Sequence, residues 1–181
     1  MQKQKAILNI GRGRTIRIPV DYQQFHIDYS SSPEGHGWNQ EDVIHILICV
    51  MKGNLEALDM DANLMNDIGT FFEDGVCVPP NIYAAVYWYE QAIEFGNDLA
   101  KSNLADILRK GSQGHPKDQR RAFDLYKSCG LPYAHYRTGE CYEHGRGVRQ
   151  DLDAAKAYYR QAYSEGHGLA DKKLKEWNFL D

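Results

Sequence analysis

Residues 134–169 read AHYRTGECYEHGRGVRQDLDAAKAYYRQAYSEGHGL, and this stretch decides the fold. Its second half places Ala155, Tyr159 and Ala162 at i, i+4 and i+7, the spacing of one face of an α-helix. Gly145 comes just before the loop. Glycine readily adopts the left-handed conformation that closes a helix, so the first helix is expected to end at this residue. Asp151 follows the loop, and its side chain is suited to accept the unpaired amide hydrogens of a helix start. The stretch therefore predicts two helices joined by a short loop.

The same pattern occurs three times along the chain. The copies begin at Leu64, Ala100 and Ala134, so the period is 36 and then 34 residues, a length typical of stacked helix pairs. The first helix of each copy is expected to end at a glycine: Gly75, Gly111 and Gly145. The second helix is expected to begin at Asn81, Asp118 and Asp151 and to end at Gly96, Gly130 and Gly166.

Small and aromatic residues recur at fixed places in the copies. The small residues Gly69, Ala105 and Gly139 share one position of the first helix, where they permit close approach of its partner helix. The tyrosines Tyr89, Tyr126 and Tyr159 share one position of the second helix. Because bulky residues at helical spacing usually belong to the core, we expect these rings to be buried between neighbouring repeats.

The string GRGV at 145–148, with Asp151 and the helix pattern 155–162 behind it, resembles the Sel-one-like repeat (SLR), a relative of the tetratricopeptide repeat. The resemblance covers about residues 64–174, and the first copy departs from the pattern at Cys77. It implies a mainly all-α fold, in which three antiparallel helix pairs stack into a curved superhelix that binds other proteins.

Three regions are expected along the chain: an N-terminal segment at 1–38, a capping helix and linker at 39–63, and the repeat array with a C-terminal cap at 64–181. Residues 6–10 and 15–20 favour a short β-hairpin around a glycine turn. Within the capping segment residues 39–52 have helical spacing, although their β-branched content leaves a buried strand open. The cap at the other end is expected from Leu174, Trp177, Phe179 and Leu180.

Composition and charge indicate a soluble globular chain that binds a basic protein. The chain has 181 residues, 43% of them apolar, and its longest nearly apolar run, 43–51, is too short for a membrane span. The net charge is −4, but residues 21–100 carry fourteen acidic side chains against the single Lys52. Such a segment repels nucleic acid and favours a basic partner. A hydrated acidic face without a partner stays the alternative.

The cysteines and the N-terminus point to the cytoplasm. The cysteines at 49, 77, 129 and 141 form no C-x-x-C pair, and we expect reduced, buried thiols. No secretory signal pattern occurs at the N-terminus, so we expect a cytoplasmic protein or a mature form whose signal was removed. The oligomeric state stays open.

Motifs of catalysis, metal binding and cofactor binding are missing, so we expect no enzyme activity, no metal and no cofactor. Cysteine-rich SLR relatives, to which a penicillin-binding or β-lactamase activity has been attributed, carry paired cysteines eight residues apart. Cys129 and Cys141 are twelve apart, which argues against that enzyme alternative. The acid pairs Glu73 with Asp74 and Glu140 with Glu143 are expected on a hydrated helix face.

The resemblance implies that partners bind along the first helices of the repeats. The predicted protein-binding residues there are Asp67, Thr70, Glu73, Asp74, Asp106, Arg109, Arg137, Glu140 and Glu143. The favoured hypothesis is a bacterial immunity protein whose acidic surface neutralises a basic toxin or secreted effector. It depends on the acidic segment, the missing catalytic motifs and a resemblance of residues 58–64 to repeat proteins encoded beside secretion-system effectors. The alternative is an adaptor in a signalling or envelope-assembly complex.

Overall fold

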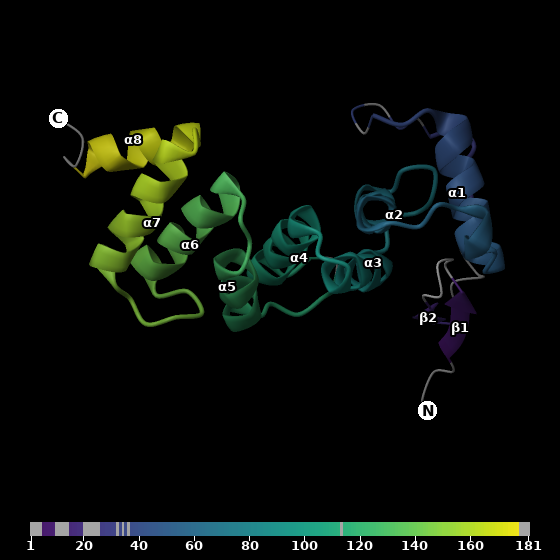
Figure 1. Cartoon of the computed structure of the whole chain (residues 1–181), viewed down its shortest axis with the longest axis horizontal. Helices are drawn as coiled ribbons and strands as arrows, with labels where there is room; N and C mark the ends of the chain where they lie inside the picture. The colour runs from purple at the N-terminus through teal and green to yellow at the C-terminus, as the bar shows by residue number, and fades with distance from the viewer. Residues whose placement is uncertain are drawn as a thin grey trace. The chain divides into compact units, whose positions relative to one another are not determined.

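The computed structural model describes residues 5–9, 15–19, 26–31, 33, 35, 37–112 and 114–177. By its contacts the chain divides into two compact units, Met1–Asn97 and Asp98–Asp181. Each unit is described by itself below. Helices dominate both units, as Figure 1 shows, so the predicted mainly all-α fold is confirmed.

The first unit begins with two short strands, β1 (Lys5–Asn9) and β2 (Thr15–Pro19), paired antiparallel. The register places Ile7 opposite Arg17. The two extended segments of the predicted hairpin are therefore present, whereas the glycine turn between them lies outside the described residues. Further along, the amide of Asp28 donates to the carbonyl of Cys77 at 2.8 Å, which ties the segment before α1 to the loop after α2.

Helix α1 (Gln40–Lys52) settles the alternative of helix or strand for residues 39–52 in favour of the helix. The side chain of Asn39 caps its start by accepting from the amide of Asp42, and Gly53 closes its end with a φ of 72°. Val43 and Leu47 are fully buried on its inner face. A short 3₁₀ turn, η2 (Leu55–Ala57), leads on to the first repeat.

The first repeat is the helix pair α2 (Ala62–Asp74) and α3 (Ile82–Glu94), packed against each other. Gly75 ends α2 in the left-handed conformation, and the side chain of Asn81 caps α3. The rings of Trp88 and Tyr89 are fully buried. Local signals in the sequence therefore fix both ends of the loop. We expected the tyrosine ring between neighbouring repeats, but Tyr89 packs against Gly69 of its own pair, because the small residue leaves room for the ring inside the pair.

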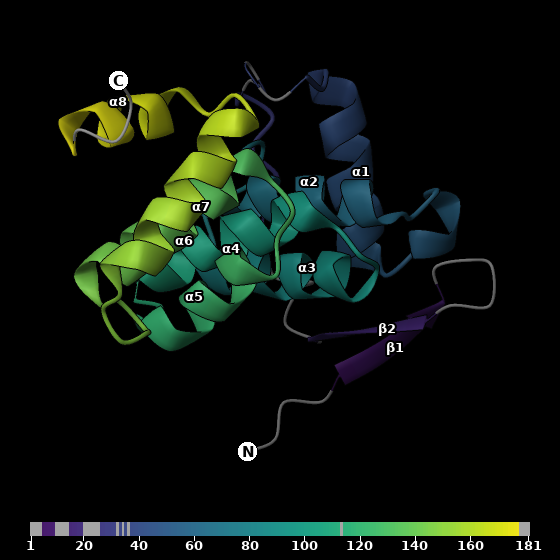
Figure 2. The ribbon, with the colours of Figure 1, turned by 60° about the vertical axis from the view of Figure 1, so that its left-hand side comes forward.

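The second unit holds the other two helix pairs and one further helix. Their bounds are α4 (Asp98–Lys110), α5 (Gln119–Lys127), α6 (Pro132–His144), α7 (Leu152–Ser164) and α8 (Gly168–Glu176). Helix α4 packs on α5 and α6 packs on α7, and Figure 2 shows α6 beside α7. Asp118 and Asp151 cap α5 and α7 as predicted.

The end of α5 corrects one prediction. We expected Gly130 to end this helix, but α5 ends at Lys127 with Ser128 as its cap. Gly130 has no positive φ, and its amide instead donates to the Asp98 carboxylate at 3.0 Å. The exit turn of the second repeat is therefore built by a side chain from the start of α4.

Two glycines permit the closest helix contacts, as the repeats predicted. A Cβ at Gly69 would lie 2.6 Å from ring atoms of Tyr89, and a Cβ at Gly139 would lie 2.7 Å from Tyr159 Cε1. Both distances are shorter than real Cβ contacts allow. A side chain at either position would therefore push the tyrosine ring off the first helix.

The ends of the core agree with the sequence where the structure describes them. Leu174 is fully buried, and the ring of Trp177 meets that of Tyr159 edge-on with centroids 5.7 Å apart. Phe179 and Leu180 lie outside the described residues. The cysteines at 49, 77, 129 and 141 are buried and form no disulfide with one another, which confirms the predicted burial of the thiols.

Candidate protein-binding surface

The buried tyrosines of the first and third repeats each bind a carboxylate of the preceding helix. The hydroxyl of Tyr89 donates to Glu73 Oε2 at 2.6 Å, and that of Tyr159 donates to Glu143 Oε2 at 2.5 Å. Burial, together with the neighbouring carboxylate, raises the pKa of both tyrosines. The hydroxyls therefore stay protonated and serve as donors.

These contacts correct the expectation of a hydrated face for Glu73 and Glu143. Both carboxylates are half-buried, and the side chain of Glu143 is only 12% exposed. Glu140 departs from the same expectation, because its side chain is 20% exposed and paired with Arg137. Asp74 alone among the nine predicted residues is fully on the surface. Helical period placed these acids away from the apolar core, but a tyrosine hydroxyl at the edge of the core draws an acceptor inward.

The second repeat makes the same kind of bond from a different position. Arg109 stands where the other repeats have glutamate, and Ala105 stands where they have glycine. The hydroxyl of Tyr126 donates instead to Asp106 Oδ1 at 2.5 Å, and Arg109 Nη2 lies 3.2 Å from the same oxygen. The tyrosine thus binds a carboxylate in all three repeats. In the second repeat this carboxylate lies about one helical turn earlier on the first helix than in the other two.

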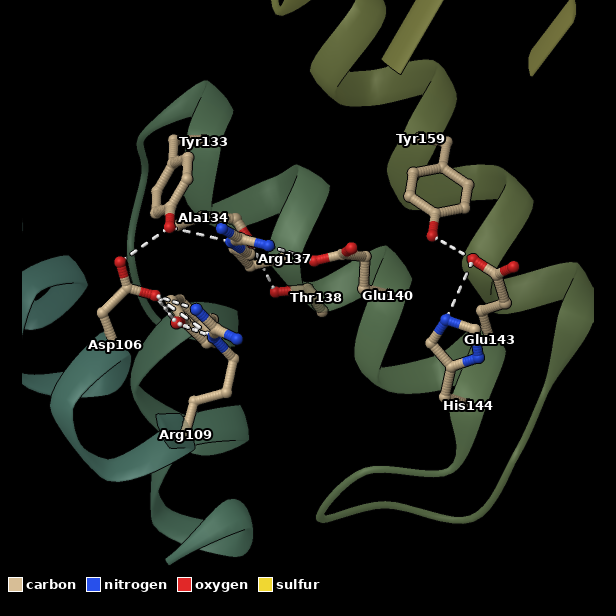
Figure 3. Close-up of polar contacts among 11 residues, drawn as sticks. Asp106, Arg109, Tyr133, Ala134, Arg137, Thr138, Glu140, Glu143, His144 and Tyr159 are labelled. Carbon is tan, nitrogen blue, oxygen red and sulfur yellow. Dashed lines mark hydrogen bonds and ion pairs between the residues drawn. The ribbon is translucent and has the colours of Figure 1, made fainter. Parts of the chain in front are cut away.

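A chain of polar contacts runs from α4 to α6 within the second unit, as Figure 3 shows. The hydroxyl of Tyr133 donates to Asp106 Oδ2 at 2.7 Å and accepts from Arg137 Nε at 2.8 Å. Arg137 Nη1 then donates to Glu140 Oε2 at 2.6 Å. The guanidinium also lies 4.9 Å from the centroid of the Tyr133 ring, a cation–π arrangement. Asp106, Arg109, Arg137 and Glu140 are therefore brought together.

Tyr133 was not predicted from the sequence, although it is the link between α4 and α6. It lies at the start of α6, and it shares the helix row of Arg137 and Glu140 at i, i+4 and i+7. The same row in the neighbouring helices begins with Leu99 on α4 and Leu169 on α8, which are 53% and 55% exposed. The shared position of Leu99, Tyr133 and Leu169 in this row was the feature of the sequence from which Tyr133 could have been selected.

Glu143 is the centre of a second cluster, which joins α6, α7 and α8. Lys173 Nζ lies 2.8 Å from Glu143 Oε1, and His144 Nε2 lies 3.8 Å from Oε2. Burial raises the pKa of Glu143, but hydrogen bonds from Lys173 and Tyr159 outweigh it and hold the pKa below its ordinary value. Lys173 was also not selected from the sequence, because it lies beyond the three repeats.

In the first unit the predicted residues all lie on α2. Asp67 Oδ2 accepts from the indole nitrogen of Trp38 at 3.1 Å, and the Thr70 hydroxyl donates to the Asp67 carbonyl at 2.7 Å. Neither α2 nor α3 contains a lysine or arginine. This part of the surface therefore carries negative charge alone, whereas α4 and α6 carry both signs. Whether the nine residues bind a partner stays a prediction.

Two features are absent from the part of the chain that the structure describes: a metal-holding cluster and a membrane-spanning helix. Among them no group of three or more His, Cys, Asp or Glu side chains is arranged to hold a metal ion. Of the helices searched in those residues, none has the length and apolar character needed to cross a membrane. Tyrosine and arginine, which are ordered on α4 and α6, are enriched where proteins recognise one another.

The fold defines the chain as a mainly all-α protein of repeated helix pairs. A family model for the Sel1 repeat matches residues 62–97, 99–128 and 132–167. The chain belongs to the Sel1 repeat family, whose repeats mediate protein–protein interaction. The three matched ranges agree with the helix pairs α2–α3, α4–α5 and α6–α7.

Solved structures and curated proteins show the same relationship. The chain is similar to a Sel1 repeat protein from Oxalobacter formigenes, with a TM-score of 0.61 and 27% identity over 76% of this chain and 99% of that one. It is also similar to a protective antigen of uropathogenic Escherichia coli with an SLR fold, with a TM-score of 0.58 and 26% identity over 66% of this chain and 26% of that one.

Two curated yeast proteins match about half of the chain. One is the chitin synthase regulator SKT5 of Saccharomyces cerevisiae, 30% identical over 95 residues, which are 50% of this chain. The other is HRD3 of Candida glabrata, a component of an ERAD-associated E3 ubiquitin-protein ligase, 32% identical over 88 residues, which are 47% of this chain. The matches span only 14% and 10% of those relatives' lengths.

Proposed function

We propose that this chain is a non-enzymatic binding protein that holds a basic partner protein against the first helices of its repeats. One observation carries the proposal: α2 and α3 contain no lysine or arginine, and α2 carries the half-buried Asp67 and Glu73 and the exposed Asp74. Charge of one sign on a surface attracts a partner of the opposite sign and excludes partners of the same sign.

The second unit supplies the other requirement of a binding surface, side chains that are ordered before the partner arrives. Arg137 is held by Tyr133 and Glu140, and Arg109 is held by Asp106. Such side chains lose little rotamer freedom on binding, and this lowers the entropic cost of forming an interface. Tyrosine and arginine are also the residues that most often dominate interface energies.

Two specific forms of this function differ in the partner. The printed names of the yeast relatives describe a regulator and a component of a multiprotein ligase, which favours an adaptor that joins proteins into a complex. The acidic α2 supports the other form, an immunity protein that covers the basic active site of a toxin or secreted effector. We place either form in the cytoplasm, where the four buried free thiols would stay reduced.

Affinity capture with the full chain tests the proposal. The chain should retain a basic protein at low salt and lose much of it at high salt, because salt screens exposed charges. Asp74→Lys should weaken capture, whereas Glu94→Lys should not. The two residues are a matched pair, since both are exposed and each is the last residue of its helix, α2 and α3.

The outcomes separate the proposals. Equal capture by the two variants, or retention of an acidic partner, would show that α2 does not select a basic protein. One stoichiometric partner whose toxicity is suppressed on co-expression would support the immunity form. Several partners without toxicity would support the adaptor form.

A further inference from the structure

The first unit contains a pocket of about 450 Å³ that neither the repeat pattern nor the predicted site accounts for. Its walls come from the residues before α1, from α1 itself, from the turn after η2 and from the start of α2. This volume lies within the range of about 300–1,000 Å³ typical of small-ligand pockets. The pocket is therefore large enough to take a long side chain or a small ligand.

One wall of the pocket is a fixed aromatic ring. The indole nitrogen of Trp38 donates to Asp67 Oδ2 at 3.1 Å, and the ring meets Phe71 edge-on with centroids 6.1 Å apart. Phe71 is fully buried, so the contact anchors Trp38 to the core of the unit. Ile46 and Leu58 add aliphatic lining. The pocket thus offers apolar surface beside an indole that is held in place.

The polar part of the lining is strongly acidic. Asp42, Asp59, Asp61 and Asp67 all line the pocket, and the described lining residues include His45 but no lysine or arginine. The side chain of Asp61 caps α2, and that of Asp42 accepts from Asn39 Nδ2 at 2.6 Å. A carboxylate has two oxygens with several acceptor sites, so these bonds leave Asp42 and Asp61 with capacity for a further donor. A positively charged guest would find several acceptors at once.

Aromatic and acidic groups together favour one kind of guest. A guanidinium is planar, stacks on aromatic faces and donates to a carboxylate with two parallel bonds. An ammonium lacks both the plane and the fork. We infer that this pocket binds one arginine side chain of a partner protein, with the carboxylates as acceptors and Trp38 as the aromatic wall. The inference rests on the proposed function for the source of the arginine, a basic partner.

Binding of small arginine analogues to the full chain tests the inference without the natural partner. Nα-acetyl-arginine amide should shift the indole resonance of Trp38 saturably in a ¹⁵N-resolved NMR titration, with the resonance identified by its loss in Trp38→Phe. Nα-acetyl-citrulline amide has nearly the same shape but no charge, and it should bind at least about tenfold more weakly, because bonds to charged groups are the stronger ones. Nα-acetyl-lysine amide should also bind more weakly.

Variants of the pocket provide the second arm. Asp42→Asn combined with Asp59→Asn should reduce the affinity for the arginine analogue about tenfold, whereas Glu94→Gln, exposed and outside the lining, should leave it unchanged. The absence of any shift with the arginine analogue, an equal affinity for citrulline, or an equal loss in Glu94→Gln would overturn the inference. Equal affinity for lysine would overturn the assignment to arginine. The analogue comparison on the unaltered chain holds even if the double variant unfolds.

Partner capture distinguishes failure of the pocket from failure of the proposed function. Full capture of a basic partner by the double variant would refute the pocket and leave the proposed function standing. Binding of the analogue without capture of any basic protein would refute the proposed function and leave an arginine-binding pocket of another purpose.

Discussion

Replacing Gly139 by alanine is the most direct test of how the third repeat is packed. The new Cβ would lie 2.7 and 2.8 Å from two ring atoms of Tyr159. That ring is fully buried, and its hydroxyl is bonded to Glu143 at 2.5 Å. The ring therefore cannot retreat without breaking the bond or compressing its neighbours.

The expected loss follows from opposing contributions. Overpacking a core by one methyl group costs about 1–3 kcal/mol, and weakening a hydrogen bond to a charged group costs about 1.5–3 kcal/mol. Because a moving ring relieves the overpacking as it loses the bond, the two costs do not add fully. Alanine in a helix regains about 1 kcal/mol over glycine. We expect Gly139→Ala to lower the free energy of unfolding by about 2 kcal/mol.

Urea denaturation and thermal melting followed by circular dichroism measure this loss. A loss of about 2 kcal/mol should lower the melting temperature by roughly 4–8 °C in a chain of this size. Gly168→Ala is the matched control, because Gly168 is the first residue of α8 and a Cβ there meets no atom within 4 Å. It should leave stability unchanged or raise it slightly.

A second measurement asks whether Tyr159 has moved. Tyr159→Phe should cost about 2 kcal/mol in the unaltered chain, as the loss of a bond to a charged acceptor, and clearly less when Gly139→Ala is already present. A Gly139→Ala chain as stable as the unaltered one, or an unchanged cost of Tyr159→Phe, would refute the packing argument.

Three further predictions follow from single side chains. Burial raises the pKa of Asp106 and Glu143, but the bonds they accept hold both below their ordinary values of 3.8 and 4.5. Their contribution to stability is therefore complete above about pH 5 and lost as the pH falls through the folded pKa values. Urea titrations at several pH values should show the free energy of unfolding falling in acid, and falling less steeply in Asp106→Asn. An equally steep fall in that variant would contradict the prediction. Burial raises the pKa of the Cys141 thiol to about 11, so a thiol reagent at pH 8 should label it slowly in the folded chain and rapidly in urea, whereas rapid labelling without urea would exclude the buried thiol. Asp151→Ala removes the cap of α7 and should lower the free energy of unfolding by about 1 kcal/mol. Asp153→Ala, at an exposed position in the first turn of the same helix, should lower it less. Equal losses would show that the side-chain cap does not stabilise α7.

The loops between helices were predictable because their signals are local. Gly75 and Gly145 adopt φ values of 76° and 64°, and Asn81 and Asp151 cap the helices that follow. Each of these roles depends on a residue type and its immediate backbone, which the sequence states directly. The failure at Gly130 has the opposite origin, since its turn is fixed by Asp98, 32 residues earlier.

The candidate surface was harder to predict, because helical period assigns a residue to a face but not to a partner. Period alone put Glu73 and Glu143 on the hydrated side, and it gave no reason to select Tyr133. Their contacts depend on how far a tyrosine hydroxyl projects from the neighbouring helix, which is a matter of tertiary packing. The aromatic periodicity did predict that these rings are buried, and the buried hydroxyls then determine which carboxylates are drawn inward.

The second repeat shows that packing and surface charge are linked. Where glycine stands on the first helix, the tyrosine hydroxyl reaches a glutamate four residues later; where Ala105 stands, the hydroxyl of Tyr126 binds Asp106, the very next residue. Since Asp106 satisfies the hydroxyl, the later position is released from supplying an acceptor and carries Arg109 instead. One methyl group in the core is thus accompanied by a change of charge on the candidate surface. Repeats of one fold can in this way offer surfaces of different charge to different partners, while the buried tyrosine hydroxyl of each repeat keeps its acceptor.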